Sequence, residues 1–388
     1  MRAALISIPS TPLLIAGKSL ARRQLDFALA AGCERIIALG NGASPEAIAL
    51  RHASEARGAR FVSVGDAHGL LGAVPAGDEL LVLAPGLLAE DRRALEALER
   101  GTAILVLPAG PGVAAGFERI DLERAWGGAL VLSGRLVERL SDLPPDSEAT
   151  AALLRIALQA RVAEKRLPEE VLAEGTWSVV GEGGDVVARQ KVWIERNLPW
   201  RSGFGLTRFV ARFGLERLAI PLLDASHARL GLRAGVAAVL AAGVAASASG
   251  WVALGLILAA VGAMLAEFAT GFALLGDAPF GAAEGRRADR FQSWLVDAGL
   301  TACAALAIDA DGLQRLFPPL VLLGVLLAGR PQAWPGPASL FGDRALLAIV
   351  FAVASGFGLA EPAIMLASLV VLALDAAVFR AKTRLTPA

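Results

Sequence analysis

The chain has 388 residues, of which 55% are hydrophobic and only 19% are charged, and its 37 basic residues balance its 37 acidic ones. This apolar excess excludes an ordinary globular domain or a disordered chain, and the even charge argues against bulk nucleic-acid binding. Cys33 and Cys303 are too few for a disulfide framework or a zinc ribbon. Residues 234–276 and 345–379 carry almost no charge, so we expect a soluble region followed by a membrane region.

Residues 1–145 alternate short apolar runs with amphipathic stretches. Runs typical of buried strands are residues 3–8, 35–39, 60–64, 79–83 and 103–107, and helical spacing covers residues 20–31, 45–57 and 90–100. Gly32, Gly58 and Gly101 follow these helices, where a C-cap glycine is expected. The alternation predicts a doubly wound, mostly parallel α/β domain. The first apolar run is too short for a signal peptide, so we expect this domain to stay in the cytosol.

The loop after the first strand leads from Pro12 through Gly17 and Lys18 into the first helix. The segment from Pro12 to Ile37, with Ala31-Gly32 before the second strand, resembles the start of the sugar-nucleotide nucleotidyltransferases. Residues 175–180, followed by Asp185 and Ala188, resemble the closing strand and last helix of that family. The resemblance implies a nucleotidyltransferase-like cytosolic domain over residues 1–197.

The chain departs from this family at the residues that carry its chemistry. The family's glycine- and arginine-rich loop gives N–H groups to the nucleotide phosphates, but residues 9–12 here contain two prolines and neither glycine nor arginine. Pro85-Gly86 stands where the family has a magnesium-binding aspartate, and residues 179–181 contain no acid. We therefore expect a fold that has lost its chemistry. Lys18 is a candidate phosphate contact, with an ordinary solvated lysine as the alternative.

Residues 198–232 form a basic junction ahead of the membrane region. Arginines alternate with aromatic and aliphatic residues there, and the spacing over residues 206–223 is typical of a helix in the membrane interface. Arg208 and Arg212 are candidates for contact with an anionic lipid or a phosphate group. The alternative is a juxtamembrane helix that only follows the positive-inside bias.

Six apolar segments follow within residues 233–388, at about 234–248, 251–275, 294–308, 316–329, 345–360 and 363–379. Ten basic residues fall on one side of these segments and only Arg315 on the other; the ten are Arg229, Arg233, Arg286, Arg287, Arg290, Arg330, Arg344, Arg380, Lys382 and Arg384. This asymmetry predicts a multi-pass protein of the inner or cytoplasmic membrane with both termini in the cytoplasm. Glu267, Asp297 and Asp375 are ionisable residues at membrane depth, which are usually functional.

The basic helix, the six spans and the polar residues at the cytoplasmic ends of spans two and three are similar to the CDP-alcohol phosphotransferases. The order of the two domains resembles the bifunctional inositol-phosphate cytidylyltransferase and di-inositol-phosphate-phosphate synthase. The phosphotransferase pattern D-x-x-D-G-x-x-A-R, then G-x-x-x-D-x-x-x-D, holds two metals that clamp the CDP pyrophosphate. Aligned at Gly271, Glu267 and Thr270 take the first two aspartate positions, and Asp289 takes the third or the fourth. About one of four metal-binding aspartates survives.

The resemblance implies Asp289 as the candidate catalytic residue and Glu267 with Asp289 as candidate metal ligands. The candidate phosphate-binding residues are Arg286, Arg287, Arg290, Arg208, Arg212 and Lys18. No cofactor is predicted outright, and Mg²⁺ or Mn²⁺ is expected only if the membrane site is active. The partners that we expect are membrane lipids, a CDP-linked or phosphate-bearing small molecule, and a second copy of the membrane domain, with no nucleic acid.

The function that follows is a divergent membrane protein of the CDP-alcohol phosphotransferase type, related to phospholipids or to phospho-inositol and other polyols, with impaired or lost family catalysis. One alternative is a non-catalytic binding or regulatory partner of an active phosphotransferase. Another is an unrelated membrane scaffold or transporter.

Overall fold

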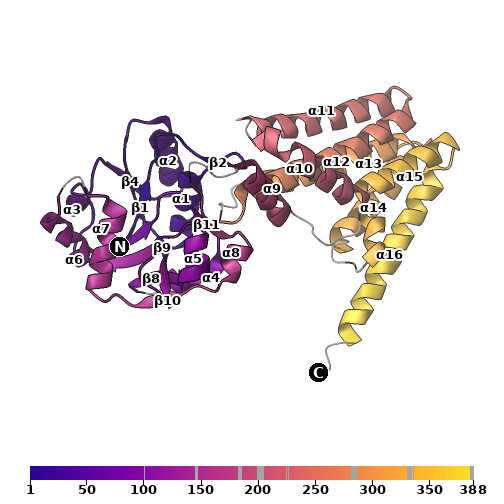
Figure 1. The fold of residues 1–388 in the computed structure, drawn as a ribbon. Helices are drawn as coiled ribbons and strands as arrows, with labels where there is room; N and C mark the ends of the chain where they lie inside the picture. Colours follow the sequence, from indigo (N-terminus) through magenta and orange to yellow (C-terminus); the bar gives the residue numbers. More distant parts are fainter. Residues whose placement is uncertain are drawn as a thin grey trace. The chain divides into compact units, whose positions relative to one another are not determined.

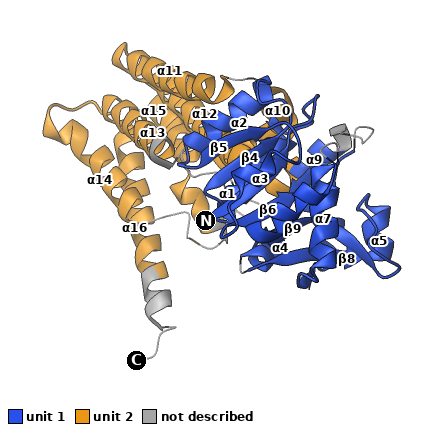
Figure 2. Ribbon diagram, turned by 90° about the vertical axis from the view of Figure 1, so that its left-hand side faces the viewer, with its two compact units in different colours: residues 1–193, 278–282 blue, residues 194–277, 283–388 orange. Residues whose placement is uncertain are grey.

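The computed structural model describes residues 1–99, 101–144, 147–181, 186–198, 205–223, 225, 227–280, 286–329, 334 and 336–384. The chain forms two compact units, one of residues 1–193 with 278–282, the other of residues 194–277 with 283–388 (Figures 1 and 2). The first boundary lies close to the expected end of the cytosolic domain at residue 197. The expected junction, residues 198–232, falls within the second unit, and the sequence did not indicate that residues 278–282 belong to the first.

The first unit is built on a seven-stranded sheet in the order β10-β8-β9-β6-β1-β4-β5. Its strands are β1 (Arg2–Ser7), β4 (Arg35–Leu39), β5 (Arg60–Val64), β6 (Glu79–Leu83), β8 (Ala103–Pro108), β9 (Arg124–Ser133) and β10 (Glu164–Arg166). Strands β6, β1, β4 and β5 are mutually parallel, as is the pair β8 and β10, whereas β9 is antiparallel to both of its neighbours. The five strands expected from apolar runs, and the mostly parallel sheet, are confirmed.

Strand β9 is the main element of this sheet that the sequence analysis missed. Gly127 and Gly128 interrupt its apolar run, and glycine in a strand usually signals a bulge or a close backbone approach. Both occur here. The register with β8 shifts between Ile104 and Val106, and a Cβ on Gly127 would lie 3.0 Å from the carbonyl oxygen of Leu105.

The helices of this unit are α1 (Leu20–Ala30), α2 (Pro45–Glu55), α3 (Leu70–Ala73), α4 (Arg92–Leu98), α5 (Ala109–Ala114), α6 (Gly134–Val137), α7 (Ala149–Gln159), α8 (Glu170–Ala173) and the start of α9 (Val186–Asn197), with the 3-10 helix η1 (Glu138–Asp142). The hydroxyl groups of Ser19 and Ser44 cap α1 and α2. Helix α4 begins two residues later than expected because the Asp91 carboxylate accepts from the backbone N–H groups of Arg93 and Ala94 and caps it. Gly32, Gly58 and Gly101 have φ values of 77°, 78° and 69°, which confirms them as helix-ending glycines.

Two small antiparallel pairs complete the unit, β2 (Leu14–Ile15) with β3 (Lys18–Ser19) and β7 (Leu87–Ala89) with β11 (Trp177–Val179). Strand β11 lies in the region expected to close the domain. Beside it, the Phe27 ring packs edge-on against both Trp177 and Phe280 at centroid distances of 5.6 Å. Phe280 belongs to the segment 278–282, which is how this short piece joins the apolar core of the first unit.

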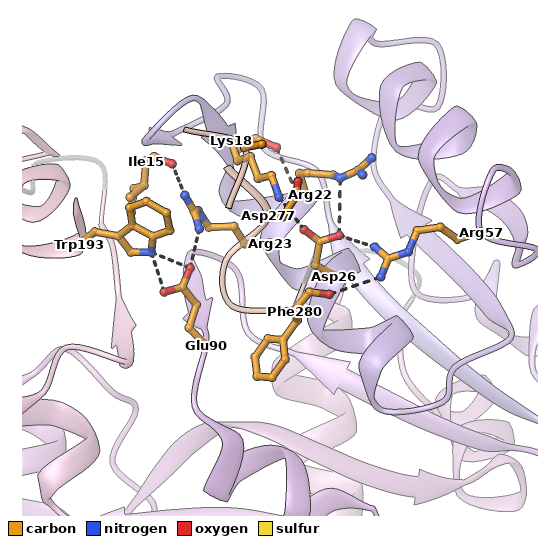
Figure 3. A network of polar contacts seen from close by, with 12 residues as sticks. Ile15, Lys18, Arg22, Arg23, Asp26, Arg57, Glu90, Trp193, Asp277 and Phe280 are labelled. Carbon is orange, nitrogen blue, oxygen red and sulfur yellow. Dashed lines mark hydrogen bonds and ion pairs between the residues drawn. The ribbon is translucent and has the colours of Figure 1, made fainter. Parts of the chain in front are cut away.

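A buried ion pair contacts α9 through Trp193, in the second half of that helix (Figure 3). The side chains of Arg23 and Glu90 form a salt bridge and are only 2% and 1% exposed. The Trp193 indole donates from Nε1 to both Glu90 carboxylate oxygens, at 2.9 and 2.7 Å, and its ring lies 4.3 Å from the Arg23 guanidinium. A charge this deeply buried is tolerated only when it is paired, so α1, the residue after β7 and α9 are mutually dependent.

The second unit is helical. It contains α10 (Leu206–Leu223), α11 (Ala228–Ala248), α12 (Val252–Asp277), α13 (Arg286–Leu306), α14 (Leu313–Gly329), the 3-10 helix η3 (Gly336–Gly342), α15 (Arg344–Gly356) and α16 (Ala360–Arg384). Helix α10 lies where the interfacial helix was expected, and α11 to α16 lie where the six apolar segments were expected. Three of them are long and apolar enough to cross a membrane, at Ala228–Ala248, Val252–Asp277 and Ala360–Val378. The others are shorter or more polar; α15 has only 13 residues, about 20 Å of helix.

Helix α12 is central to this unit and packs against α10, α11, α13 and α15. Small residues allow its close approach to α11: a Cβ on Gly255 would lie 2.5 Å from the carbonyl oxygen of Gly243. Apolar helices that pack this closely leave little freedom at their contacts, so the side chains on the remaining face of α12 are held in defined positions.

The Arg23–Glu90 pair gives a direct test of the first unit. Glu90→Gln keeps an acceptor for Trp193 but removes the negative charge that forms the buried salt bridge with Arg23. We expect the free energy of unfolding to fall by about 3–5 kcal/mol, the usual cost of breaking a buried pair. The change is measured by unfolding the full chain in detergent with guanidinium chloride and reading the midpoint of the transition from tryptophan fluorescence.

Glu164→Gln is the matched control, because Glu164 pairs with Arg124 at the protein surface, with side chains 29% and 41% exposed. Its midpoint should stay close to that of the unsubstituted chain. Equal midpoints for Glu90→Gln and Glu164→Gln would contradict the structural role of the buried pair.

Candidate functional site

A polar cavity of about 280 Å³ lies among the helices of the second unit. Its walls come from the start of α10, one face each of α12 and α13, the end of α14, and the junction of η3 with α15. The side chains and backbone that line it belong to Gly205, Thr207, Arg208, Ala263, Ala266, Glu267, Thr270, Gln292, Ser293, Val296, Asp297, Leu327, Ser339, Gly342, Asp343 and Arg344. Charged and hydroxyl-bearing residues are concentrated here within an otherwise apolar unit.

Helical spacing explains why residues far apart in the sequence share this wall. Glu267 and Thr270 lie on one face of α12, three residues apart, with Ala263 one turn before Glu267. Ser293 and Asp297 lie one turn apart on α13. The two faces are joined by a buried hydrogen bond, in which Gln292 Nε2 donates to the carbonyl oxygen of Ala266 at 2.8 Å.

Two arginine–carboxylate pairs supply the charge of the cavity. Arg208 Nε lies 3.6 Å from Glu267 Oε1, and Arg344 Nε donates to Asp297 Oδ1 at 3.0 Å. The arginine side chains are 23% and 20% exposed, whereas Asp297 is only 9% exposed. Burying a lone carboxylate in such surroundings is costly, so each arginine compensates one acidic residue on a core helix.

Asp343 fixes the ends of two helices at the cavity. Its carboxylate caps α15 by accepting from the backbone N–H groups of Ala345 and Leu346, at 3.0 and 3.2 Å. The same carboxylate accepts from the backbone N–H of Thr207 at 2.9 Å and from the Thr207 hydroxyl. The start of α10, with Arg208, is therefore held beside the start of α15, with Arg344.

The acidic residues of this cavity do not fit a two-metal centre. Glu267 and Asp297 each face a guanidinium group, and Asp343 accepts from three backbone N–H groups and a hydroxyl. Within the described residues, no three His, Cys, Asp or Glu side chains gather closely enough to hold a metal ion. Two-metal chemistry needs several carboxylate oxygens directed at shared cations.

Asp289 lies outside the cavity lining. It forms an ion pair with Arg233 at 3.0 Å, with its side chain 21% exposed. The structure therefore does not bring Asp289 and Glu267, the two expected metal ligands, together in this cavity. Asp297, two turns further along α13, is the carboxylate that lines the cavity with Glu267.

The other predicted arginines differ in their positions. Arg208 lines the cavity, but Arg212 donates from Nε to Glu216 Oε1 at 2.9 Å on the exposed side of α10. Arg290 is exposed. The side chains of Arg286 and Arg287 lie outside the described residues, although their backbone begins α13.

Lys18 is not an ordinary solvated lysine, and it is not among the lining residues of the helical cavity. Its ammonium group forms an ion pair with Asp26 Oδ2 at 3.1 Å, and its side chain is 18% exposed (Figure 3). Arg22 and Arg57 approach the same carboxylate, which is 6% exposed. Lys18 thus belongs to a cluster of three basic side chains around one buried acid.

Asp343, Thr207 and Gln292 were not predicted as parts of the site. Asp297 was expected as an ionisable residue at membrane depth but was not among the candidate site residues, and Arg344 was counted only as a topology marker. The signal for Asp343 was present, because an aspartate directly before an apolar helical run is a typical N-cap. For Asp297, a repeat of polar residues every fourth position at 289, 293 and 297 marks one face of α13.

Comparison of this sequence with protein-family models and with curated proteins finds no match. The assignment of a function therefore rests on the geometry of the cavity and on the sequence resemblances.

The first unit should not bind magnesium–CTP with useful affinity. Prolines at positions 9 and 12 remove N–H donors that phosphates need, and Pro85-Gly86 supplies no carboxylate after β6. Isothermal titration of the full chain in detergent with CTP, with and without Mg²⁺, measures this. Magnesium-dependent binding in the micromolar range would overturn the expectation.

Proposed function

We propose that this chain is a membrane protein of the CDP-alcohol phosphotransferase type whose helical cavity binds a phosphate-bearing polyol or lipid headgroup without two-metal catalysis. The observation that carries the proposal is the pair of arginines, Arg208 and Arg344, held at one polar cavity by Asp343.

The arginines have donors to offer to a ligand. A guanidinium group has five N–H donors, arranged in a fork that matches phosphate oxygens. Arg344 donates from Nε to Asp297 and from Nη1 to the carbonyl oxygen of Gly342, at 3.0 and 2.9 Å, which uses two of the five. The Arg208 ion pair at 3.6 Å is longer than a normal hydrogen bond. A phosphate group in the cavity would therefore meet N–H donors from two directions.

The remaining polar side chains suit hydroxyl groups. Thr270 and Ser293 carry hydroxyls, and Glu267 and Asp297 carry carboxylate oxygens that accept hydrogen bonds from alcohols. The two carboxylates also compete with a bound phosphate for the arginines, so an inorganic anion alone should bind weakly. A ligand that combines a phosphate with several hydroxyls, such as a phosphorylated polyol, satisfies both kinds of group.

The same residues argue against the family's catalysis. In the resemblance, Thr270 stands at an aspartate position and Glu267 is compensated by Arg208, so the donor set for two metals is lacking. The proposal therefore assigns binding to this cavity, with no transfer of a CDP-linked phosphate to an alcohol.

Substitution of the cavity arginines tests the proposal. Arg208→Gln and Arg344→Gln should each weaken binding of inositol phosphate and of CDP-glycerol by about 10–100-fold, since a hydrogen bond to a charged group is worth about 1.5–3 kcal/mol. Isothermal titration of the full chain in detergent measures the affinity. Arg212→Gln is the matched control, because Arg212 lies one turn from Arg208 on the exposed side of α10.

Equal weakening in the Arg212→Gln protein would indicate a general electrostatic effect and contradict a site in the cavity. Absence of binding of both compounds to the unsubstituted, folded protein would reject the proposal and favour a scaffold or transporter. Release of CMP from CDP-glycerol would reject the loss of catalysis.

We also propose that α11 to α16 form six spans with both termini in the cytoplasm, as the distribution of basic residues in the loops favours. The three longest helices support membrane insertion, and the shorter ones would need tilt or flanking residues to cross. Reporter fusions after Ala388 and after Gly312 should report opposite sides of the membrane. The same side for both would contradict this topology.

A further inference from the structure

The first unit contains a second cavity, of about 250 Å³. It lies at the carboxyl ends of the adjacent parallel strands β1 and β6, since Ser7 ends β1 and Pro85-Gly86 follows β6. Ligands of open α/β sheets bind at this edge, beyond the carboxyl ends of the strands. The residues that line the cavity are Ser7, Ile8, Pro9, Pro12, Leu13, Ser19, Leu20, Ala21, Gln24, Glu46, Pro85, Gly86, Val179, Val180 and Gly181.

The electrostatics of this cavity are opposite to those of a phosphate site. Among the described residues of its lining there is no lysine or arginine, and Glu46 is the one charged residue. Most of the other lining residues are aliphatic or proline. The Glu46 carboxylate would repel an anionic ligand, whereas it would attract a cation or an N–H donor.

Hydrogen-bonding groups are placed at the cavity wall. The Ser19 hydroxyl accepts from the backbone N–H of Arg22 and donates to Glu46, which fixes the position of the carboxylate on the first turn of α2. Ser7 Oγ is buried and has no hydrogen-bond partner within the described residues. A buried hydroxyl without a partner is costly, and a ligand in the cavity could supply the missing bond.

The part of the cavity wall formed by the loop after β6 and the end of β11 is held in place by backbone contacts. Val180 donates from its backbone N–H to the carbonyl oxygen of Gly86 at 2.8 Å. Gly86 has a φ of 72°, and a Cβ there would lie 2.7 Å from the carbonyl oxygen of Val180. Only glycine allows this close approach, so the loop after β6 and the end of β11 form a fixed apolar boundary.

We infer that this cavity binds a small, flat organic molecule that is neutral or cationic and donates N–H groups to Glu46, such as an amine- or amidine-bearing ring. The apolar part of this molecule would fill the space between the prolines and the aliphatic side chains, and its N–H groups would face Glu46. This site is separate from the phosphate-binding cavity of the helical unit and does not depend on the function proposed for it.

Three isosteric probes that differ in charge test the inference: benzamidine, benzamide and benzoate. On the full chain in detergent, ligand-observed NMR titration should give an affinity for benzamidine about tenfold or more above that for benzamide, because a charge-assisted hydrogen bond is roughly twice as strong as a neutral one. Benzoate should not bind or compete.

Glu46→Gln should abolish the preference of benzamidine over benzamide. Glu55→Gln is the matched control, since Glu55 lies on the same helix but is exposed and outside the cavity lining. The melting temperature of each variant shows whether it remains folded.

Equal affinity for all three probes, or tighter binding of benzoate, would overturn the inference. So would unchanged selectivity in folded Glu46→Gln protein, or failure of both benzamidine and benzamide to bind the unsubstituted protein. These outcomes are independent of the binding of inositol phosphate to the helical unit.

Discussion

Charge compensation inside apolar surroundings is the constraint on which the helical unit depends. Glu267 and Asp297 lie on helices whose other contacts are mainly apolar, and each is matched by an arginine that enters from a different helix. The Asp297 side chain is only 9% exposed and could not be buried alone without a large loss of free energy, whereas Glu267 is 29% exposed and needs less compensation. Asp343 then holds the two arginine-bearing helix ends together by capping α15 and accepting from Thr207. The cavity thus lies where the charged side chains of α10, α12, α13 and α15 compensate one another.

The cavity of the helical unit and the cavity of the α/β unit have opposite chemistry. The described lining of the helical cavity offers two guanidinium groups and several hydroxyls, whereas the described lining of the α/β cavity offers one carboxylate among mainly apolar residues. Lys18, the basic residue of the α/β unit that the sequence made a candidate for phosphate, is paired to Asp26, and the buried Arg23 is paired to Glu90. In this unit, the described lining of the cavity beside the proline-rich residues 9–12 contains no basic residue.

Much of the fold could be predicted because local patterns determined it. Continuous apolar runs identified β1, β4, β5, β6 and β8, and capping residues marked the helix ends. Strand β9 was missed because Gly127-Gly128 is a bulge within a strand, which local sequence does not distinguish from a loop. The site was predicted less well. Glu267 was predicted because it is an ionisable residue at membrane depth, and Arg208 because it lies in the basic helix before the first span. The ion pair of Arg344 with Asp297 joins residues 47 positions apart, so it depends on helix packing. Asp289 was favoured by motif spacing, yet in the structure it forms an ion pair with Arg233 on α11.

The most direct test of this account is the metal dependence of ligand binding to the helical cavity. Arginine forks bind phosphate without a cation, so the affinity of the full chain for CDP-glycerol should be the same in EDTA and in Mg²⁺, with no CMP released in either. Isothermal titration and nucleotide chromatography on one preparation give both answers. Binding that disappears in EDTA and returns with Mg²⁺, or release of CMP only when Mg²⁺ is present, would contradict the account and show that the carboxylates hold metal.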